Sequence, residues 1–357
     1  MNNRQIFAAT IGVLSLVTGI LAVRILWFPF AGDVPPPPQQ EFPPSRVGKI
    51  SGPYTYKNLS VYLVHGDTTY VGDTPLILDE ALKAKLAIVH ETADVNELAI
   101  ENLSKSDDVF VQAGDIVKGG QQDRVLGVDL IVPSRSGRMP IDALCVEHGR
   151  WTQRRNESPT AFEEAPNMIA SKDLKLAAKH VKSQSEVWAR VENEQAKLSN
   201  AASTNVRSSV SRSSLQLSLE NEKVRENADA YIAKLSSIVA DAGDIVGFVF
   251  AINGEINSGD VYSSQQLFAK LWPRLLKAAA IEAVAELSDL PEKTDRSPTI
   301  DEISGFLSQA DSAAISDRQR VTDRISIVTR ESKEAVLIET NDTAQNSGPI
   351  HRNYLMK

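Results

Sequence analysis

The 357-residue chain contains a single cysteine, Cys145, and only five histidines. One cysteine excludes an intrachain disulfide and any zinc site built from several cysteines. The histidines form no H-E-x-x-H or paired pattern, and the sequence contains no C-x-x-C motif, so we predict no metal site. The fold must therefore be held together by packing.

The chain also lacks an excess of positive charge. Its 38 lysines and arginines are outnumbered by 46 aspartates and glutamates, which gives a formal net charge of -8. Nucleic-acid binding needs a basic face that displaces phosphate counterions, so we expect no nucleic acid as a partner. With 42% hydrophobic and 24% charged residues, the composition is that of a globular protein with one large or two modest domains.

Residues 6–28 form the longest apolar run of the chain. About 20 apolar residues in a helix cross a bilayer core of about 30 Å, so this run predicts an uncleaved transmembrane signal-anchor helix. A cleaved signal peptide is the competing interpretation, although the run is long for one and no A-x-A site follows. Residues 1–5 are then a short cytoplasmic tail and the proline-rich residues 29–46 an extended stalk. We expect a single-pass protein of the cytoplasmic membrane, with the membrane as a partner and the C-terminal domain outside the cytoplasm.

Residues 47–357 predict a single large α+β domain. In residues 47–165 short apolar runs alternate with turn residues, which is typical of antiparallel hairpins. In residues 166–357 the apolar period becomes mainly helical, and Trp188 and Trp272 are interpreted as core anchors rather than ligand-stacking platforms. The expected fold is therefore a β-rich N-terminal half packed with a mainly helical C-terminal half, preceded by one transmembrane helix.

Two consecutive glycines, Gly119 and Gly120, open a polar segment of the β-rich half. The lysine and the glycine spacing of a phosphate-binding loop or a dinucleotide fingerprint are missing, so we predict no cofactor. Two interpretations stay open. The backbone N–H groups of the glycines bind an anion with help from Arg124, or the segment is a tight turn with an internal ion pair between Asp123 and Arg124.

Side chains alternate between the two faces of a strand, and this predicts which residues after the turn lie on the same face. Cys145 and Glu147 fall on one face of a predicted strand and His148 falls on the other, which argues against a metal chelate from Cys145 and His148. A lone cysteine in an apolar strand is usually a core residue. A candidate polar cluster remains, whose alternative role is a buried ion-pair network that fixes strand register. Its members are Asp123, Arg124, Glu147 and Arg150.

Five ordered motifs of this chain resemble the ARG and rhodanese-phosphatase-superfamily-associated protein domain. They are Gly119–Arg124 (GGQQDR), Cys145–Trp151 (CVEHGRW), Gln184–Trp188 (QSEVW), Phe248–Gly254 (FVFAING) and Leu271–Leu276 (LWPRLL). The similarity extends from about Val47 to the C-terminus. The family name records an association with ADP-ribosylglycohydrolase and rhodanese-phosphatase proteins, and the resemblance carries over no catalytic residue.

Two functions of different classes fit these features. The first is a membrane-anchored binding or scaffold domain displayed outside the cytoplasmic membrane, whose partner is a protein or a small anionic ligand. The second is a hydrolase or transferase that acts on a phosphorylated or ADP-ribosyl-type ligand. The second is supported by the polar cluster and by the family's associations, which are an analogy rather than a mechanism.

Overall fold

The computed structural model describes residues 48–240, 243–287, 296–345 and 348–357, which fall in one compact unit. No helix among these residues is long and apolar enough to cross a membrane. The predicted transmembrane helix over residues 6–28, with its tail and the stalk over 29–46, lies outside the described residues. The expected fold class is corrected accordingly: the described chain is α+β and contains no membrane-spanning helix.

Six strands of the N-terminal half close into a barrel in the order β10-β5-β4-β11-β7-β8, and every neighbouring pair is antiparallel. Their bounds are β4 (Ala87–Glu91), β5 (Glu97–Asn102), β7 (Asp115–Gly119), β8 (Arg124–Leu126), β10 (Gly137–Cys145) and β11 (Ala161–Ile169). Beside the barrel, β3 (Leu76–Ile77), β6 (Val109–Val111) and β9 (Leu130–Val132) form a three-stranded sheet, and α1 (Leu78–Lys83) follows β3 directly. The apolar run over residues 125–132 is therefore two strands in two different sheets.

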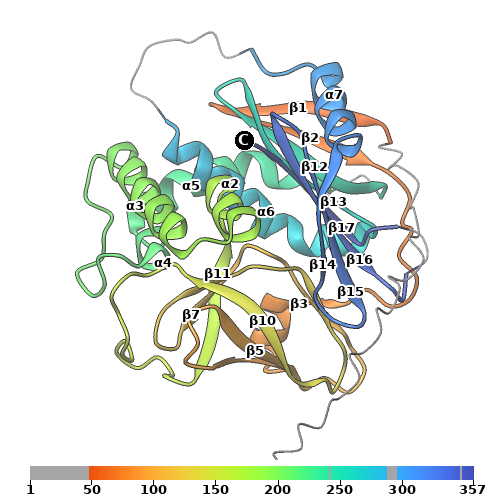
Figure 1. Ribbon diagram of the computed structural model, residues 1–357. Coiled ribbons are helices and arrows are strands. Elements are labelled where there is room, and N and C mark those ends of the chain that lie inside the picture. Colours follow the sequence, from red (N-terminus) through yellow and green to blue (C-terminus); the bar gives the residue numbers. More distant parts are fainter. Residues whose placement is uncertain (1–47, 241–242, 288–295, 346–347) are drawn as a thin grey trace, which may run out of the picture. The chain divides into compact units, whose positions relative to one another are not determined.

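An eight-stranded antiparallel sheet joins the two ends of the described chain in the order β1-β2-β12-β13-β17-β16-β15-β14 (Figure 1). Its strands are β1 (Ile50–Tyr56), β2 (Leu59–His65), β12 (Ile245–Ile252), β13 (Glu255–Tyr262), β14 (Ala314–Arg320), β15 (Ile325–Glu331), β16 (Ala335–Asp342) and β17 (His351–Met356). Six of the eight come from the C-terminal half, which therefore supplies most of this sheet in addition to the helices expected there. Apolar alternation does not predict β17, because His351 and Asn353 are polar yet buried.

Helices cover both faces of this sheet. On one face α6 (Gln265–Ala285) packs against β12, and on the other α7 (Ile300–Asp311) packs against β1 and β16 (Figure 1). Successive side chains of β2 point to opposite faces of the sheet. Val61 and Leu63 therefore pack in the core beneath α6, while Tyr62 and Val64 pack in the core beneath α7. Burying each such side chain contributes about 1.5–3 kcal/mol.

The remaining helices lie between residues 172 and 239. They are α2 (Lys172–Lys175), a π-helical turn (Leu176–Val181), α3 (Gln184–Ala201), α4 (Leu215–Leu219), α5 (Glu222–Leu235) and a 3-10 turn (Ser236–Val239). Apolar residues at helical spacing continue from Leu174 to Leu198, but the helix is interrupted at Lys182, which adopts a left-handed φ of 53°. α3 then starts anew, with the Ser183 hydroxyl accepting from the N–H of Glu186 as an N-cap.

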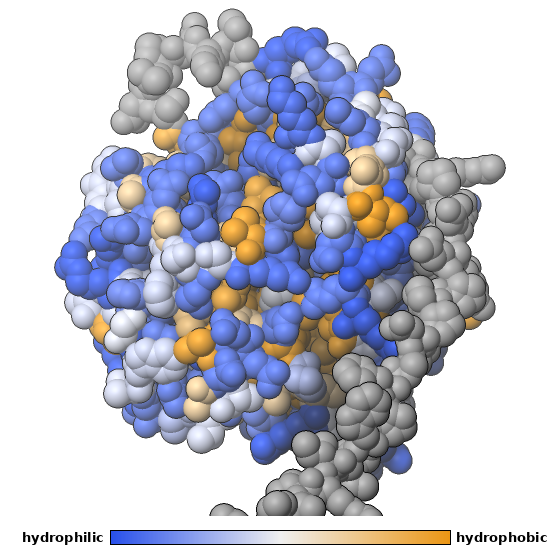
Figure 2. Space-filling model, viewed as in Figure 1, coloured by the Kyte–Doolittle hydropathy of each residue, from blue (hydrophilic) through white to orange (hydrophobic). Residues whose placement is uncertain are grey.

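Hydrophilic residues cover most of the face shown in Figure 2, and apolar residues show only in patches between them. Two of the large apolar side chains that are exposed, Val71 and Trp151, belong to loops. On this face the chemistry available at the surface is therefore mainly polar and charged.

Candidate functional site

One end of the barrel collects the loops that carry the predicted polar residues. The strand registers set the C-terminal end of β7 (Gly119) beside the N-terminal end of β11 (Phe162), and the C-terminal end of β10 (Cys145) beside the N-terminal end of β8 (Arg124). β4 also finishes at this end, at Glu91. The loops over residues 92–96, 120–123 and 146–160 therefore lie together. These loops and the adjoining strand ends bring together the six candidate site residues predicted from the sequence: Gly119, Gly120, Asp123, Arg124, Glu147 and Arg150.

The glycine turn is tight for steric reasons. Gly119 and Gly120 have φ values of 121° and 51°, and a Cβ on Gly120 would lie 2.4 Å from the Phe162 ring. The N–H of Gly119 donates to Oδ1 of Asp123 at 3.1 Å, and the N–H of Gly120 donates to the carbonyl of Ser158 at 3.1 Å. Both N–H groups therefore hold the turn itself in place, and any positive charge offered to a ligand at this end comes from side chains.

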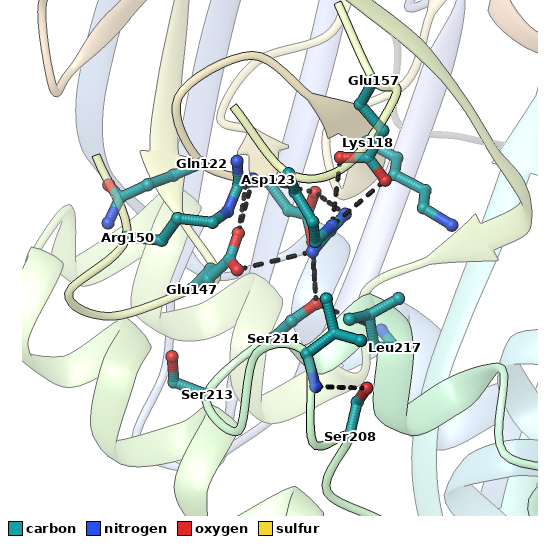
Figure 3. Close-up of polar contacts among 12 residues, drawn as sticks. Lys118, Gln122, Asp123, Glu147, Arg150, Glu157, Ser208, Ser213, Ser214 and Leu217 are labelled. Atoms are coloured by element: carbon teal, nitrogen blue, oxygen red, sulfur yellow. Dashed lines mark hydrogen bonds and ion pairs between the residues drawn. The ribbon is translucent and has the colours of Figure 1, made fainter. Parts of the chain in front are cut away.

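Asp123 and Glu147 form the centre of an ion-pair network and are both fully buried. Arg154 donates to the two carboxylate oxygens of Asp123 at 2.8 and 3.0 Å, and Arg150 pairs with Glu147 at 2.7 Å. Ser214, 91 residues further along the chain, donates to Asp123 at 2.8 Å. In Figure 3 Asp123, Glu147 and Ser214 converge from three separate segments, with Arg150 beside Glu147.

Hydrogen bonds and opposite charges within this network keep Glu147 and Arg154 ionised. Burial alone would raise the pKa of Glu147, but the hydrogen bond and the charge of Arg150 lower that pKa overall. Burial would lower the pKa of Arg154, but hydrogen bonds and charge from Asp123 raise it overall. Glu147 and Arg154 thus stay ionised near neutral pH, and Glu147 holds no proton to donate. The partners of Asp123 are Arg154 and, at 3.7 Å, Arg150, rather than Arg124.

Arg124 occupies a separate position within the same barrel end. Its side chain is fully buried and donates to Sγ of Cys145 at 2.8 Å, while Nη2 lies 3.6 Å from Glu91. The ring of Trp151 covers the guanidinium at 5.9 Å. Burial raises the pKa of the Cys145 thiol, so this thiol is a poor nucleophile near neutral pH.

A groove of about 580 Å³ lies above the network, between the loop over residues 148–155 and the loop over residues 210–213. We call it the arginine groove, because its basic lining residues are His148, Arg150, Arg154, Arg155 and Arg212. Arg150 and Arg154 face the buried carboxylates. Arg155 and Arg212 are exposed, and within the described part of the chain neither has a carboxylate partner. The groove therefore carries positive charge that the protein does not neutralise locally.

Four residues of this site were not singled out from the sequence: Arg154, Arg155, Arg212 and Ser214. Two signals were present. Two consecutive arginines, Arg154 and Arg155, lie three and four residues after Trp151, and the segment over residues 200–214 is rich in arginine as well as serine. Neither signal shows that the two loops meet, because their contact depends on bonds such as that from Ser213 Oγ to the carbonyl of His148 at 2.6 Å.

A second buried polar cluster joins the barrel side of the molecule to the large sheet. His351 lies between Asp129, at 2.7 Å, and Asp260, at 3.0 Å, and all three are at most 1% exposed. Burial would lower the pKa of His351, but the two carboxylates raise it overall. Burial lowers the pKa of nearby Lys179, whose ammonium donates to Asn353 at 3.2 Å. These groups are bonded to one another in the core, so their role is to fix the packing of β17.

A further pocket of about 420 Å³ lies between α3, α6 and the β12–β13 turn. Two of its carboxyl groups are bound by consecutive residues: Ser171 donates to Glu194 at 2.7 Å, and the N–H of Lys172 donates to Glu282 at 3.1 Å. Burial is the main reason that the pKa of each glutamate is raised to about 7. Repulsion between the two carboxylates adds to the shift of Glu282.

This pair should make stability depend on pH. A glutamate whose pKa is higher in the folded state contributes its stability below the unfolded value of 4.5, and this contribution is lost as the pH rises through about 7. We expect Glu282→Gln to leave the free energy of unfolding unchanged at pH 5 and to raise it by about 2 kcal/mol at pH 8, after allowance for partial exposure. Urea unfolding at both pH values measures this. Exposed Glu255→Gln, on the rim of the same pocket, is the control, and equal effects of the two variants would contradict the assignment.

Among the described residues, no group of three or more histidine, cysteine, aspartate or glutamate side chains is arranged to hold a metal ion. Cys145 is buried and His148 is exposed, and the imidazole packs edge-on against Trp188 at 4.4 Å. The chemistry that this barrel end offers is thus that of guanidinium groups in an open groove.

The fold and the groove together define an α+β domain with a basic groove at one end of a six-stranded barrel. Residues 48–354 match the family model of the ARG and Rhodanese-Phosphatase-superfamily-associated Protein domain. The chain belongs to this family, which confirms the resemblance of the five sequence motifs. No curated protein and no solved structure matches the chain.

Proposed function

We propose that this protein is a binding domain that holds the phosphate group of an anionic ligand in the arginine groove. The observation that carries the proposal is the pair of exposed guanidinium groups, Arg155 and Arg212, which line the groove from two loops and lack carboxylate partners among the described residues. Planar guanidinium groups match the oxygens of phosphate and carboxylate with paired hydrogen bonds.

The buried network beneath the groove supports this function by positioning the loops. Arg150 donates to the carbonyls of Gly119 and Gly120, each at 3.2 Å, and so ties the loop over residues 148–155 to the glycine turn. Arg154 reaches both Asp123 and Ser214, and so ties the same loop to the start of α4. A groove held in one shape before binding loses little entropy when a ligand enters.

The alternative of a hydrolase or transferase has weaker support at this position. A general acid or base must exchange a proton near the operating pH. Glu147 has a lowered pKa and is fully engaged by arginines, and Asp123 accepts from Gly119, Arg154 and Ser214. The carboxyl groups with a pKa of about 7, Glu194 and Glu282, line the pocket beside α3 rather than this groove.

Thermal unfolding with inorganic pyrophosphate tests the proposal. A ligand that binds the folded state raises the unfolding midpoint, by a few degrees when it is present at about 100 times its dissociation constant. We expect this rise in the wild-type protein, its weakening at high salt, and its loss in the double variant Arg155→Ala/Arg212→Ala.

The matched control removes the same charge elsewhere. Arg138 and Arg318 are exposed, and Arg138 lies at the N-terminal end of β10, the end of the barrel remote from the groove. Arg138→Ala/Arg318→Ala should keep the pyrophosphate-dependent rise. Equal loss in both double variants, or no rise in the wild type, would contradict the proposal.

A further inference from the structure

A second pocket borders the arginine groove. It has a volume of about 440 Å³ and shares three lining residues with the groove: His148, Arg212 and Ser213. Because Arg212 borders both spaces, a ligand whose phosphate lies beside this guanidinium lies next to the second pocket. Each space has the size of a small-molecule site, for which about 300–1,000 Å³ is usual.

The lining of the second pocket differs from that of the groove. Ser185, Trp188, Glu192 and Gln195 recur at spacings of three and four residues, so one face of α3 forms its wall. Trp188 is the large aromatic side chain of this wall. The sequence assigns Trp188 to the core, but the residue is only partly buried, because Val187 and Val191 take the core positions of this helix.

Trp188 has two features of a ligand platform. Its indole Nε1 has no hydrogen-bond partner among the described residues, although tryptophan usually bonds this group when it is buried. His148, which also lines the groove, packs edge-on against its ring at 4.4 Å with an interplanar angle of 72°. An aromatic ring that enters the pocket thus meets a wall built from the indole of Trp188 and the imidazole of His148.

Charged side chains line the same pocket as this indole. Arg207 and Arg212 line the pocket, and Glu192 pairs with Arg207 at 3.8 Å. Guanidinium groups stack on aromatic rings, and the exposed Glu192 carboxylate can accept from an exocyclic amine. The wall therefore suits a planar ring that carries hydrogen-bonding groups at its edge.

We propose that the two pockets form one site for a nucleotide, with the phosphate in the arginine groove and the base against Trp188. The inference rests on the proposed phosphate-binding function and adds the class of ligand. Stacking of a base on an aromatic side chain strengthens binding by about tenfold or more. A nucleotide should therefore bind more tightly than the same sugar phosphate without its base.

Isothermal titration calorimetry with AMP and ribose 5-phosphate tests this on the wild-type protein. We expect AMP to bind at least about tenfold more tightly than ribose 5-phosphate. Equal affinities would overturn the nucleotide assignment and leave phosphate binding standing. Binding of neither compound would overturn both proposals.

Variants then locate the base. Trp188→Ala should reduce the affinity for AMP to that for ribose 5-phosphate, while the affinity for ribose 5-phosphate stays at the wild-type value. Trp151→Ala is the control, because Trp151 is exposed at the same barrel end but lines neither pocket, and it should keep the preference for AMP. If Trp188→Ala keeps the preference, the base does not bind at this helix and the proposal is wrong. If that variant does not fold, the ratio of affinities in the wild-type protein still decides the nucleotide assignment.

Discussion

Replacing Arg154 by alanine should destabilise the protein by about 3–5 kcal/mol, because it leaves the buried carboxylate of Asp123 without its main cation. Arg154 is 4% exposed and donates to both oxygens of Asp123. After the substitution the nearest cation to Asp123 is Arg150, at 3.7 Å, which already pairs with Glu147 at 2.7 Å. Urea unfolding followed by circular dichroism measures the change in free energy.

The neighbouring residue supplies the control for this variant. Arg155 carries the same charge one position further along, but its side chain is exposed, so Arg155→Ala should change stability by no more than about 0.5 kcal/mol. Arg154→Lys should fall between the two alanine variants, because lysine keeps the charge but loses the paired geometry. Equal stabilities of Arg154→Ala and Arg155→Ala would mean that the buried network does not hold this barrel end together.

The second large effect is expected from Asp129→Asn. Asp129 is 1% exposed and accepts three hydrogen bonds, from the N–H of Ala113 at 2.7 Å, the hydroxyl of Thr340 at 2.5 Å and Nδ1 of His351 at 2.7 Å. An asparagine amide would turn an N–H group toward a donor and remove the charge that His351 faces. We expect a loss of about 3 kcal/mol or more at pH 5.5.

The pH dependence of this loss follows from two opposite shifts. Burial would raise the pKa of Asp129, but His351, Lys179 and the hydrogen bonds lower it overall, so its contribution is present above the unfolded value of 3.8 and is lost as the pH falls. The pKa of His351 is raised, so its contribution is complete below the unfolded value of 6.5 and is lost as the pH rises through the folded value. The penalty of Asp129→Asn should therefore be larger at pH 5.5 than at pH 9.

Exposed Asp142, on β10, provides the comparison for this variant. Asp142→Asn should change the free energy of unfolding by no more than about 0.5 kcal/mol at either pH. A penalty for Asp129→Asn that is the same at pH 5.5 and pH 9 would show that the charge on His351 is not what Asp129 stabilises.

Local sequence patterns are enough to predict several strands, turns and helices. Particular residues show where such patterns fail. The Asn253-Gly254 pair marks the turn between β12 and β13, and of the two consecutive serines before α6 it is Ser264 that caps the helix. β17 was missed because His351 and Asn353 are polar, and only partners on distant strands explain their burial. A pattern along the chain contains no information about such partners.

Some residues of the candidate site could likewise be predicted from the sequence, and others could not. Asp123 and Glu147 could be predicted, because Asp123 follows the glycine turn directly before β8, and Glu147 follows β10, the barrel neighbour of β8. Ser214 could not be predicted in this way, since it reaches Asp123 across 91 residues of chain. Its loop is placed by tertiary hydrogen bonds rather than by local preference.

The most direct test of the central claim is a crystal structure of the protein grown with inorganic pyrophosphate. We expect the anion in the arginine groove, with its oxygens about 2.7–2.9 Å from guanidinium nitrogens of Arg155 and Arg212. Pyrophosphate bound at another position, with these two arginines free of it, would contradict the assignment of the groove as the binding site.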